Sequence, residues 1–268
     1  MLTSIIITTY NAHEKLIKVL DCFKYQSIDN FEIIIADDGS DKSIKEKNLS
    51  IVEKLGIPIK YVWHDDLGFR AAKIRNEAVK KSTGEYIIFL DGDCLPFKDF
   101  VFEHIKLSEK GFFCRGNRIK LSKKFTNKIL HKDFNINKIK FNDFVKLRTM
   151  NDINRLLPLC RLGDFKLRKF SKKRWEGAKT CNLAVWKTDF EKINGFDENY
   201  IGWGREDSDL VVRLINSGIY RKEATFSTGV LHMWHDIISR ENFSRNDKLL
   251  QLAINEKRTY IDTGLTKR

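Results

Sequence analysis

The first 120 residues alternate short, β-rich apolar runs with stretches that repeat apolar residues at helical spacing. Strand-like runs cover residues 3–9, 31–36, 59–63 and 85–90. Helical patterns between them cover residues 13–26, 42–55 and 69–81. Repeated β-α-β order predicts a mostly parallel sheet with helices on both faces. We therefore expect an α/β fold in which ligands bind outside the carboxyl ends of the strands.

The pattern changes in the second half of the chain. Residues 120–174 are basic and irregular, with weak helical stretches at 141–147 and 165–174. Strand signals return at 180–186 and 227–231, and helical signals at 189–193, 206–216 and 246–260. We expect a single domain with a first half at 1–119, a basic insertion at 120–174 and a smaller second half at 175–268.

Composition narrows the class of protein. A chain of 268 residues with 42% hydrophobic residues can bury one large core. Its apolar runs are shorter than the roughly 20 residues that span a bilayer. The five cysteines are scattered, which favours reduced thiols in the cytoplasm. A strand-like run begins right after Met1, so we expect no signal peptide.

Positive charge is concentrated in one segment. Residues 115–174 hold 19 Lys/Arg and four Asp, within a chain of net charge +13. Three explanations stay open: a solvated surface, contact with anionic lipid headgroups or an anionic acceptor, and nucleic-acid binding. No nucleic-acid recognition module accompanies the charge, so nucleic acid is the least favoured of these partners.

Two acidic clusters lie more than a hundred residues apart. Asp91 and Asp93 follow an apolar strand, where paired carboxylates suit a hard divalent cation. Glu206 and Asp207 follow Trp203 just before a helical pattern, and a Trp beside carboxylates suits a sugar ring with its hydroxyls. The alternatives are an ordinary turn for the first cluster and an acidic first helical turn for the second.

Two histidines, His232 and His235, follow the predicted strand at 227–231. Either could complete a cation site with Asp93, and the alternative is a surface or satisfied core histidine. Carboxylate and imidazole ligands with a diphosphate suit Mn²⁺ or Mg²⁺ better than a catalytic Zn²⁺. Glycine-rich dinucleotide and Walker motifs are absent, which disfavours dehydrogenases and P-loop enzymes.

Four motifs follow one another along the chain, at residues 4–11, 34–40, 68–76 and 91–93. In these the chain resembles nucleotide-sugar-dependent glycosyltransferases of family 2, which have the GT-A fold. Residues 194–198 and 202–209 resemble the acceptor region of β-1,4-galactosyltransferases and chondroitin-polymerase-like enzymes.

The resemblance implies a role for each candidate residue. The UDP-sugar would be bound by Thr8, Tyr10, Asp38, Arg70, Arg75 and Asp91. Asp93 would bind the cation with His235 or His232. Asp207 would be the general base, and Trp203, Gly204 and Glu206 would bind the acceptor. For the two arginines the alternative is a solvated helix face.

The resulting hypothesis is an inverting, metal-dependent transfer of a hexose (Glc, Gal or an N-acetyl form) from a UDP-sugar to a hydroxyl. The acceptor would be a glycan or lipid-linked molecule in bacterial lipopolysaccharide or capsule synthesis. The expected location is the cytoplasm, with peripheral contact at the inner membrane. The rivals are a glycoside hydrolase, which also uses paired carboxylates, a non-catalytic basic glycan- or nucleic-acid-binding protein, and a nucleotidyltransferase.

Overall fold

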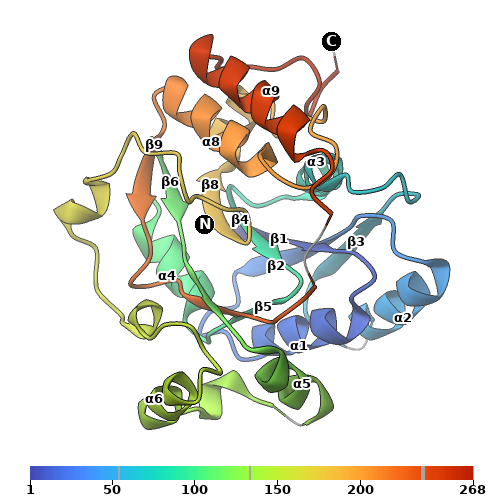
Figure 1. The fold of residues 1–268 in the computed structure, drawn as a ribbon, viewed down its shortest axis with the longest axis vertical. Helices are drawn as coiled ribbons and strands as arrows, with labels where there is room; N and C mark the ends of the chain where they lie inside the picture. Colours follow the sequence, from blue (N-terminus) through green and yellow to red (C-terminus); the bar gives the residue numbers. More distant parts are fainter. Residues whose placement is uncertain (54, 133, 237–238, 268) are drawn as a thin grey trace.

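A seven-stranded mixed sheet forms the centre of the protein (Figure 1). The computed structural model describes residues 1–53, 55–132, 134–236 and 239–267. The strand order is β3-β2-β1-β4-β8-β6-β9. The first four strands in this order are parallel, as the β-α-β pattern predicts, and comprise β1 (Thr3–Thr9), β2 (Phe31–Asp37), β3 (Ile59–Trp63) and β4 (Tyr86–Asp91).

The second half of the chain extends the same sheet. β8 (Asn182–Trp186) runs antiparallel to β4 and to β6 (Phe112–Arg115). The short β9 (Tyr220–Glu223) closes the edge beside β6. Sequence analysis found β8 but missed β6 and β9. The two predicted halves therefore share one sheet, which brings residues far apart in sequence to one edge.

Alternate side chains of the central strands enter two different cores. Ile5 and Ile7 pack on the face covered by α1 (His13–Phe23) and α4 (Phe100–Leu107). Ile6 packs on the other face with α3 (Ala71–Lys81), α7 (Lys187–Lys192) and α8 (Glu206–Asn216). Runs of β-branched residues buried on both faces are typical of parallel strands. In Figure 1, α1 lies below the sheet, and α8 lies above it beside α9 (Phe243–Asn255).

Most predicted helices are present with shifted ends. α1 stops at Phe23 rather than residue 26, and α9 covers 243–255 rather than 246–260. α2 (Lys42–Val52) is shorter than the predicted 42–55, of which residue 54 lies outside the described residues. α3 begins at Ala71 rather than residue 69 because the backbone N–H of Arg70 donates to the Asp38 carboxylate (2.9 Å).

A second, three-stranded sheet was not predicted, and it positions part of the site. It has the order β5-β10-β7 and contains β5 (Cys94–Pro96), β7 (Arg118–Lys120) and β10 (Val230–His232). The predicted strand at 227–231 is therefore shifted toward its C-terminal end. His232 pairs with Cys94, and the Met233 N–H donates to the Asp93 carbonyl (2.9 Å). This pairing brings the histidines to the end of β4.

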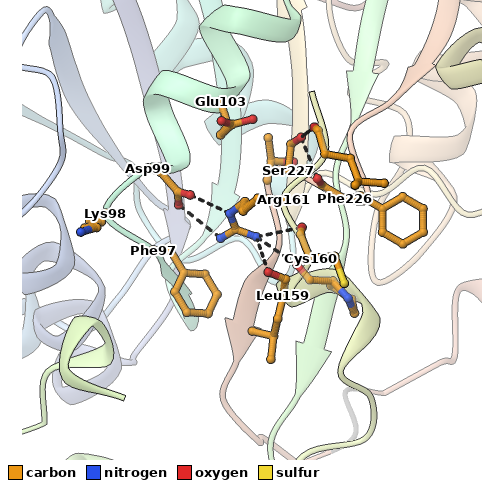
Figure 2. Close-up of polar contacts among 12 residues, drawn as sticks. Phe97, Lys98, Asp99, Glu103, Leu159, Cys160, Arg161, Phe226 and Ser227 are labelled. Carbon is orange, nitrogen blue, oxygen red and sulfur yellow. Dashed lines mark hydrogen bonds and ion pairs between the residues drawn. The ribbon is translucent and has the colours of Figure 1, made fainter. Parts of the chain in front are cut away.

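The basic segment packs firmly against the rest of the protein. It contains α5 (Lys123–His131), α6 (Phe141–Thr149) and three short 3-10 turns, η1 (Ile136–Lys138), η2 (Leu157–Leu159) and η3 (Lys166–Lys169). The predicted helix at 165–174 is thus only the turn η3. Figure 2 shows the Arg161 guanidinium bound to the Asp99 carboxylate. Its Nε donates to Oδ2 (2.6 Å) and its Nη2 donates to Oδ1 (3.2 Å). Its remaining nitrogen donates to backbone carbonyls of residues 158–160.

Candidate active site

Both acidic clusters line one cavity of about 800 Å³. It opens at the carboxyl ends of β1, β2 and β4, where a parallel sheet places its ligands. All but one of the predicted site residues line it, namely Thr8, Tyr10, Asp38, Arg75, Asp91, Asp93, Trp203, Gly204, Glu206, Asp207, His232 and His235. Among the described lining residues Arg70 is missing, and its Nε donates to the Leu67 carbonyl (3.2 Å).

The tight turn after β4 sets the first acidic cluster. Asp91 pairs with Thr8 in the sheet register, and the Gly92 N–H donates to the Thr8 carbonyl (2.7 Å). A Cβ atom at Gly92 would lie 3.0 Å from that oxygen, so a larger residue would push the turn outward. The glycine therefore lets Asp91 and Asp93 both line the cavity.

Asp38 and Tyr10 form the wall near the ends of β1 and β2. The buried Asp38 carboxylate accepts the Arg70 backbone N–H, and its other oxygen lies 2.9 Å from Nε2 of His64. The Tyr10 hydroxyl donates to Asp66 (3.0 Å), while half of the residue stays exposed. Asp38 is thus held rigidly, and the Tyr10 ring is left accessible to a ligand.

Arg75 joins the two acidic clusters. It is 4% exposed, and its guanidinium donates to Thr8 Oγ1 (3.0 Å), Glu206 Oε1 (3.2 Å) and Asp91 Oδ1 (3.4 Å). A guanidinium presents its donors in a fixed planar fork, so it can hold several acceptors at set positions. The structure therefore shows Arg75 holding protein carboxylates from both halves of the chain.

Glu206 and Asp207 begin α8 after a strained backbone run. Gly202, Gly204 and Arg205 all have positive φ angles, and Arg205 adopts this with φ +79° despite its side chain. Its guanidinium forms a 2.6 Å ion pair with Asp247 on α9, which helps to hold the turn. This turn points the first two carboxylates of the helix into the cavity.

Burial raises the pKa of both carboxyl groups at the start of α8. The pKa of Glu206 rises to about 7 because of burial and the neighbouring Asp207 charge, which outweigh the opposing effect of Arg75. Burial also raises the pKa of Asp207, against the opposing charges of Lys179 and Arg75. Carboxyl groups with such pKa values suit proton transfer near neutral pH.

Asp93 lies between the two histidines. Its carboxylate oxygens lie 3.5 Å from His232 Nε2 and 3.7 Å from His235 Nε2. Burial and the charge of Asp91 raise the pKa of Asp93 to about 6. Burial and the nearby Arg118 lower the pKa of His232 to about 2, so its imidazole stays neutral and able to bind a metal.

These residues fit a hard divalent cation. Asp93 and the neutral His232 offer donor atoms close to one another, and His235 Nε2 lies 3.7 Å from the other Asp93 oxygen, a donor set that suits Mn²⁺ or Mg²⁺. The Cys94 thiol is close to Asp93 and His232. Burial raises its pKa well above the usual value, so it stays a protonated thiol rather than a soft thiolate ligand.

Trp203 lines the same cavity. Its ring stacks on Phe243 with centroids 5.9 Å apart, and the Arg240 guanidinium lies 5.1 Å from its centroid. A Cβ at Gly204 would lie 3.1 Å from the Phe243 ring. The two glycines around Trp203 thus let the chain turn closely against α9, which fixes the indole at the cavity edge.

Among the cavity-lining residues that sequence reasoning missed are Lys15, Arg118, Trp175 and Lys179. Lys15 lies on α1 and Arg118 on β7, and both place positive charge near Asp93 and His232. In a chain with 49 Lys/Arg, single cations give no signal of their own. The position of Lys15 just after the β1 end is the one cue that could have marked it.

Two family models and several known proteins match the chain. Residues 4–171 match glycosyl transferase family 2, and residues 165–236 match the N-terminal domain of galactosyltransferase. Validoxylamine A glucosyltransferase of Streptomyces hygroscopicus subsp. jinggangensis is 27% identical over 235 residues, covering 85% of this chain and 55% of that protein. Escherichia coli chondroitin synthase is 28% identical over 230 residues, covering 81% and 32%. The chain thus spans about half the length of the first relative, and less of the second.

Solved structures share the fold at low identity. A Pyrobaculum calidifontis mannosyltransferase in complex with GDP-Man and Mn²⁺ gives a TM-score of 0.58 at 15% identity, covering 96% of this chain and 62% of that one. S. aureus TarS 1-349 in complex with UDP-GlcNAc gives 0.56 at 15% identity, covering 96% and 69%. The predicted α/β fold of the GT-A type is therefore confirmed.

The matched family covers more than half of the chain and includes the parallel strands and the first acidic cluster. The rival assignments to a hydrolase, a nucleotidyltransferase or a non-catalytic binding protein do not agree with it. The chain belongs to glycosyl transferase family 2 and is a glycosyltransferase with a galactosyltransferase-like second half.

Proposed function

We propose that this glycosyltransferase moves a hexose from a UDP-sugar to a hydroxyl of a glycan or lipid-linked acceptor, with inversion at the anomeric carbon. The observation that supports this proposal most is that Asp93 with two histidines and Glu206 with Asp207 line the same cavity. Residues 1–119 would bind the nucleotide sugar and residues 175–268 the acceptor. Relatives in bacterial polysaccharide synthesis support an acceptor in lipopolysaccharide or capsule assembly.

The donor would bind along the carboxyl ends of β1, β2 and β4. Thr8, Tyr10 and Asp38 would contact the base and ribose, with Asp91 near the ribose. Lys15 and Arg118 supply positive charge where the diphosphate would lie, since phosphate oxygens favour such donors. The TarS complex with UDP-GlcNAc supports a uridine nucleotide in a fold of this type.

Asp93 would hold the cation, with His235 or His232 as a further ligand. A bound Mn²⁺ or Mg²⁺ would supply Lewis-acid neutralisation of charge on the departing diphosphate. The mannosyltransferase complex with Mn²⁺ supports a divalent ion in this fold. The protein contributes the buried carboxylate and the neutral His232 that keep the ion in place.

Asp207 would act as the base for the acceptor. The acceptor oxygen forms a bond to the anomeric carbon while the bond from that carbon to the diphosphate breaks, and the hydroxyl proton passes to Asp207. Arg75 and Lys179 favour the ionised carboxylate that this step needs. Glu206 and Trp203 would position the acceptor, and such positioning lowers the barrier further. Because attack and departure occur on opposite faces, the configuration inverts.

A screen of UDP release tests this proposal. The protein is incubated with candidate acceptor glycans and with UDP-Glc, UDP-Gal, UDP-GlcNAc or UDP-GalNAc, in Mn²⁺ or in chelator, with GDP-Man as a control donor. We expect one UDP-sugar to be consumed only with the metal, and the anomeric proton coupling of the product to show inversion. Turnover of GDP-Man alone, or full activity in chelator, would refute the donor or the metal assignment.

A further inference from the structure

A short loop at residues 162–174, here called the 162–174 loop, presents apolar side chains to solvent. Leu167 is 72% exposed and Phe170 is 87% exposed. They stand three residues apart at the turn η3, and side chains at that spacing in a 3-10 turn point the same way. Contiguous exposed apolar surface is a feature of interaction sites, whereas apolar side chains exposed singly are normal.

The loop is held in place from beneath. Arg168, between the two apolar residues, is 2% exposed. Its guanidinium donates to the carbonyls of Gly163 (2.9 Å), Leu162 (2.6 Å) and Glu223 (2.6 Å), and to the Ser227 hydroxyl (2.8 Å). These bonds fix the turn with Arg168 pointing inward. The exposure of its neighbours therefore follows from the packing of the loop itself.

Cations surround the exposed apolar pair. Residues 164–176 hold six Lys/Arg and two acidic residues. Asp164 pairs with the buried Lys222 (2.7 Å), and Glu176 lies 3.9 Å from Arg174. Among the ion pairs of the described residues, none involves Lys166, Lys172 or Lys173, and all three are exposed. The loop thus combines an apolar tip with uncompensated positive charge.

We propose that the 162–174 loop docks the protein on an anionic lipid surface. Leu167 and Phe170 enter the boundary between headgroups and acyl chains, and Lys166, Lys172 and Lys173 contact the lipid phosphates. Apolar side chains that insert while adjacent cations meet anionic headgroups are the two components of interfacial membrane binding. An acidic protein or RNA would satisfy the lysines but gives no apolar phase for Leu167. No helix among the described residues has the length and apolar character to cross a bilayer.

The 162–174 loop is adjacent in the chain to one wall of the candidate active site. The chain runs from the loop directly into residues 175–181, all of which line the candidate active site. Docking would therefore hold one wall of the cavity close to the lipid surface, within reach of a lipid-linked acceptor. This consequence rests on the proposed function, whereas docking itself does not.

Flotation with lipid vesicles tests the docking. The full chain is mixed with phosphatidylcholine vesicles, or with vesicles in which a third of the lipid is phosphatidylglycerol. We expect flotation only with the anionic vesicles, and release as salt is raised. The double variant Leu167→Ser/Phe170→Ser should lose about tenfold or more in vesicle affinity because two apolar side chains no longer insert. Lys166→Gln/Lys173→Gln should lose about fivefold for each charge removed.

Matched substitutions elsewhere serve as controls. Leu252→Ser/Phe102→Ser removes the same residue types at sites that are 47% and 44% exposed, and it should float like the wild type. Equal flotation with neutral vesicles, or wild-type affinity of the Leu167→Ser/Phe170→Ser variant, would overturn the proposal. Retention of the wild type by single-stranded RNA but not by anionic vesicles would overturn it as well. UDP release measured without vesicles tests the proposed transfer independently of docking.

Discussion

The two acidic clusters contain the same kind of groups but have different neighbours. Asp93 lies beside two imidazoles, one of them held neutral. Asp91 shares the Arg75 guanidinium with Glu206. Glu206 and Asp207 lie beside the permanent cations Arg75 and Lys179. Neutral imidazole nitrogens can share a metal cation with a carboxylate, whereas a guanidinium has no acceptor atom and repels a metal ion. The comparison predicts a cation site for the first cluster and a base for the second.

The largest effect is expected at the second cluster. Asp207→Asn keeps the shape of the side chain but removes the proton acceptor, so turnover should fall by about 10²–10⁴-fold. Binding of the UDP-sugar, measured by calorimetry, should stay near the wild-type value because the proposed donor site is at the other cluster. The control variant Glu176→Gln changes an exposed carboxylate of the same cavity and should lower turnover by about twofold at most. Near-normal turnover of Asp207→Asn would remove the base from the mechanism.

Arg75 is the link that lets the two clusters differ. Arg75→Gln would leave the buried Glu206 and the partly buried Asp91 without their shared cation, so the free energy of unfolding should fall by about 3–5 kcal/mol. Urea denaturation measures the loss. Arg70→Gln, five residues earlier at the start of the same helix, serves as the control and should change stability by no more than about 0.5 kcal/mol. If the two variants were equally stable, Arg75 would not be the connection between the clusters.

The first cluster is tested by its metal. Asp93→Asn should weaken Mn²⁺ binding by about 100-fold, as followed by paramagnetic resonance of the free ion, because it removes the anionic ligand. Asp207→Asn should bind Mn²⁺ like the wild type, since in the proposed mechanism its carboxylate contacts the acceptor and not the ion. The comparison fails if both variants lose Mn²⁺ equally.

The parallel strands could be predicted because their residues are buried on both faces, which gives continuous apolar runs such as Ile5 to Ile7. The strands β7 and β9 could not, because their short sequences are rich in Arg and Lys and show no apolar alternation. Buried cations there, such as Lys222, are paired with distant acids that no local pattern reveals.

The site residues also divide into those that the sequence could predict and those that it could not. Residues in motifs, such as Asp93 and Asp207, line the cavity as the sequence predicts. The role of Arg75 depends on Glu206, 131 residues later, so helix spacing alone could not show that the guanidinium binds protein carboxylates. Arg70, equally plausible by sequence, turns to the Leu67 carbonyl because Asp38 engages its backbone N–H.

The smallest expected effect is the dependence of the free energy of unfolding on pH, to which the two clusters contribute separately. Asp93 and Glu206 have pKa values of about 6 and about 7, raised by burial above their ordinary values. The folded protein therefore keeps protons that the unfolded chain releases. Without metal, the free energy of unfolding should fall as pH rises from about 4 to 7, by at most about 1.4 kcal/mol per pH unit for each group.

Saturating Mn²⁺ should remove only the share of this slope that belongs to Asp93, because the ion replaces the proton there and leaves Glu206 unchanged. Thermal or urea unfolding at several pH values, with and without Mn²⁺, measures both shares. Asp93→Asn should abolish the effect of Mn²⁺ on the slope, whereas Glu206→Gln should preserve it. A metal-free protein whose stability does not change between pH 4 and 7, or Mn²⁺ stabilising Asp93→Asn as strongly as the wild type, would contradict the distinction between the clusters. Asp93 and Glu206 would then differ in the source of the compensating positive charge, which is a bound ion for Asp93 and Arg75 for Glu206.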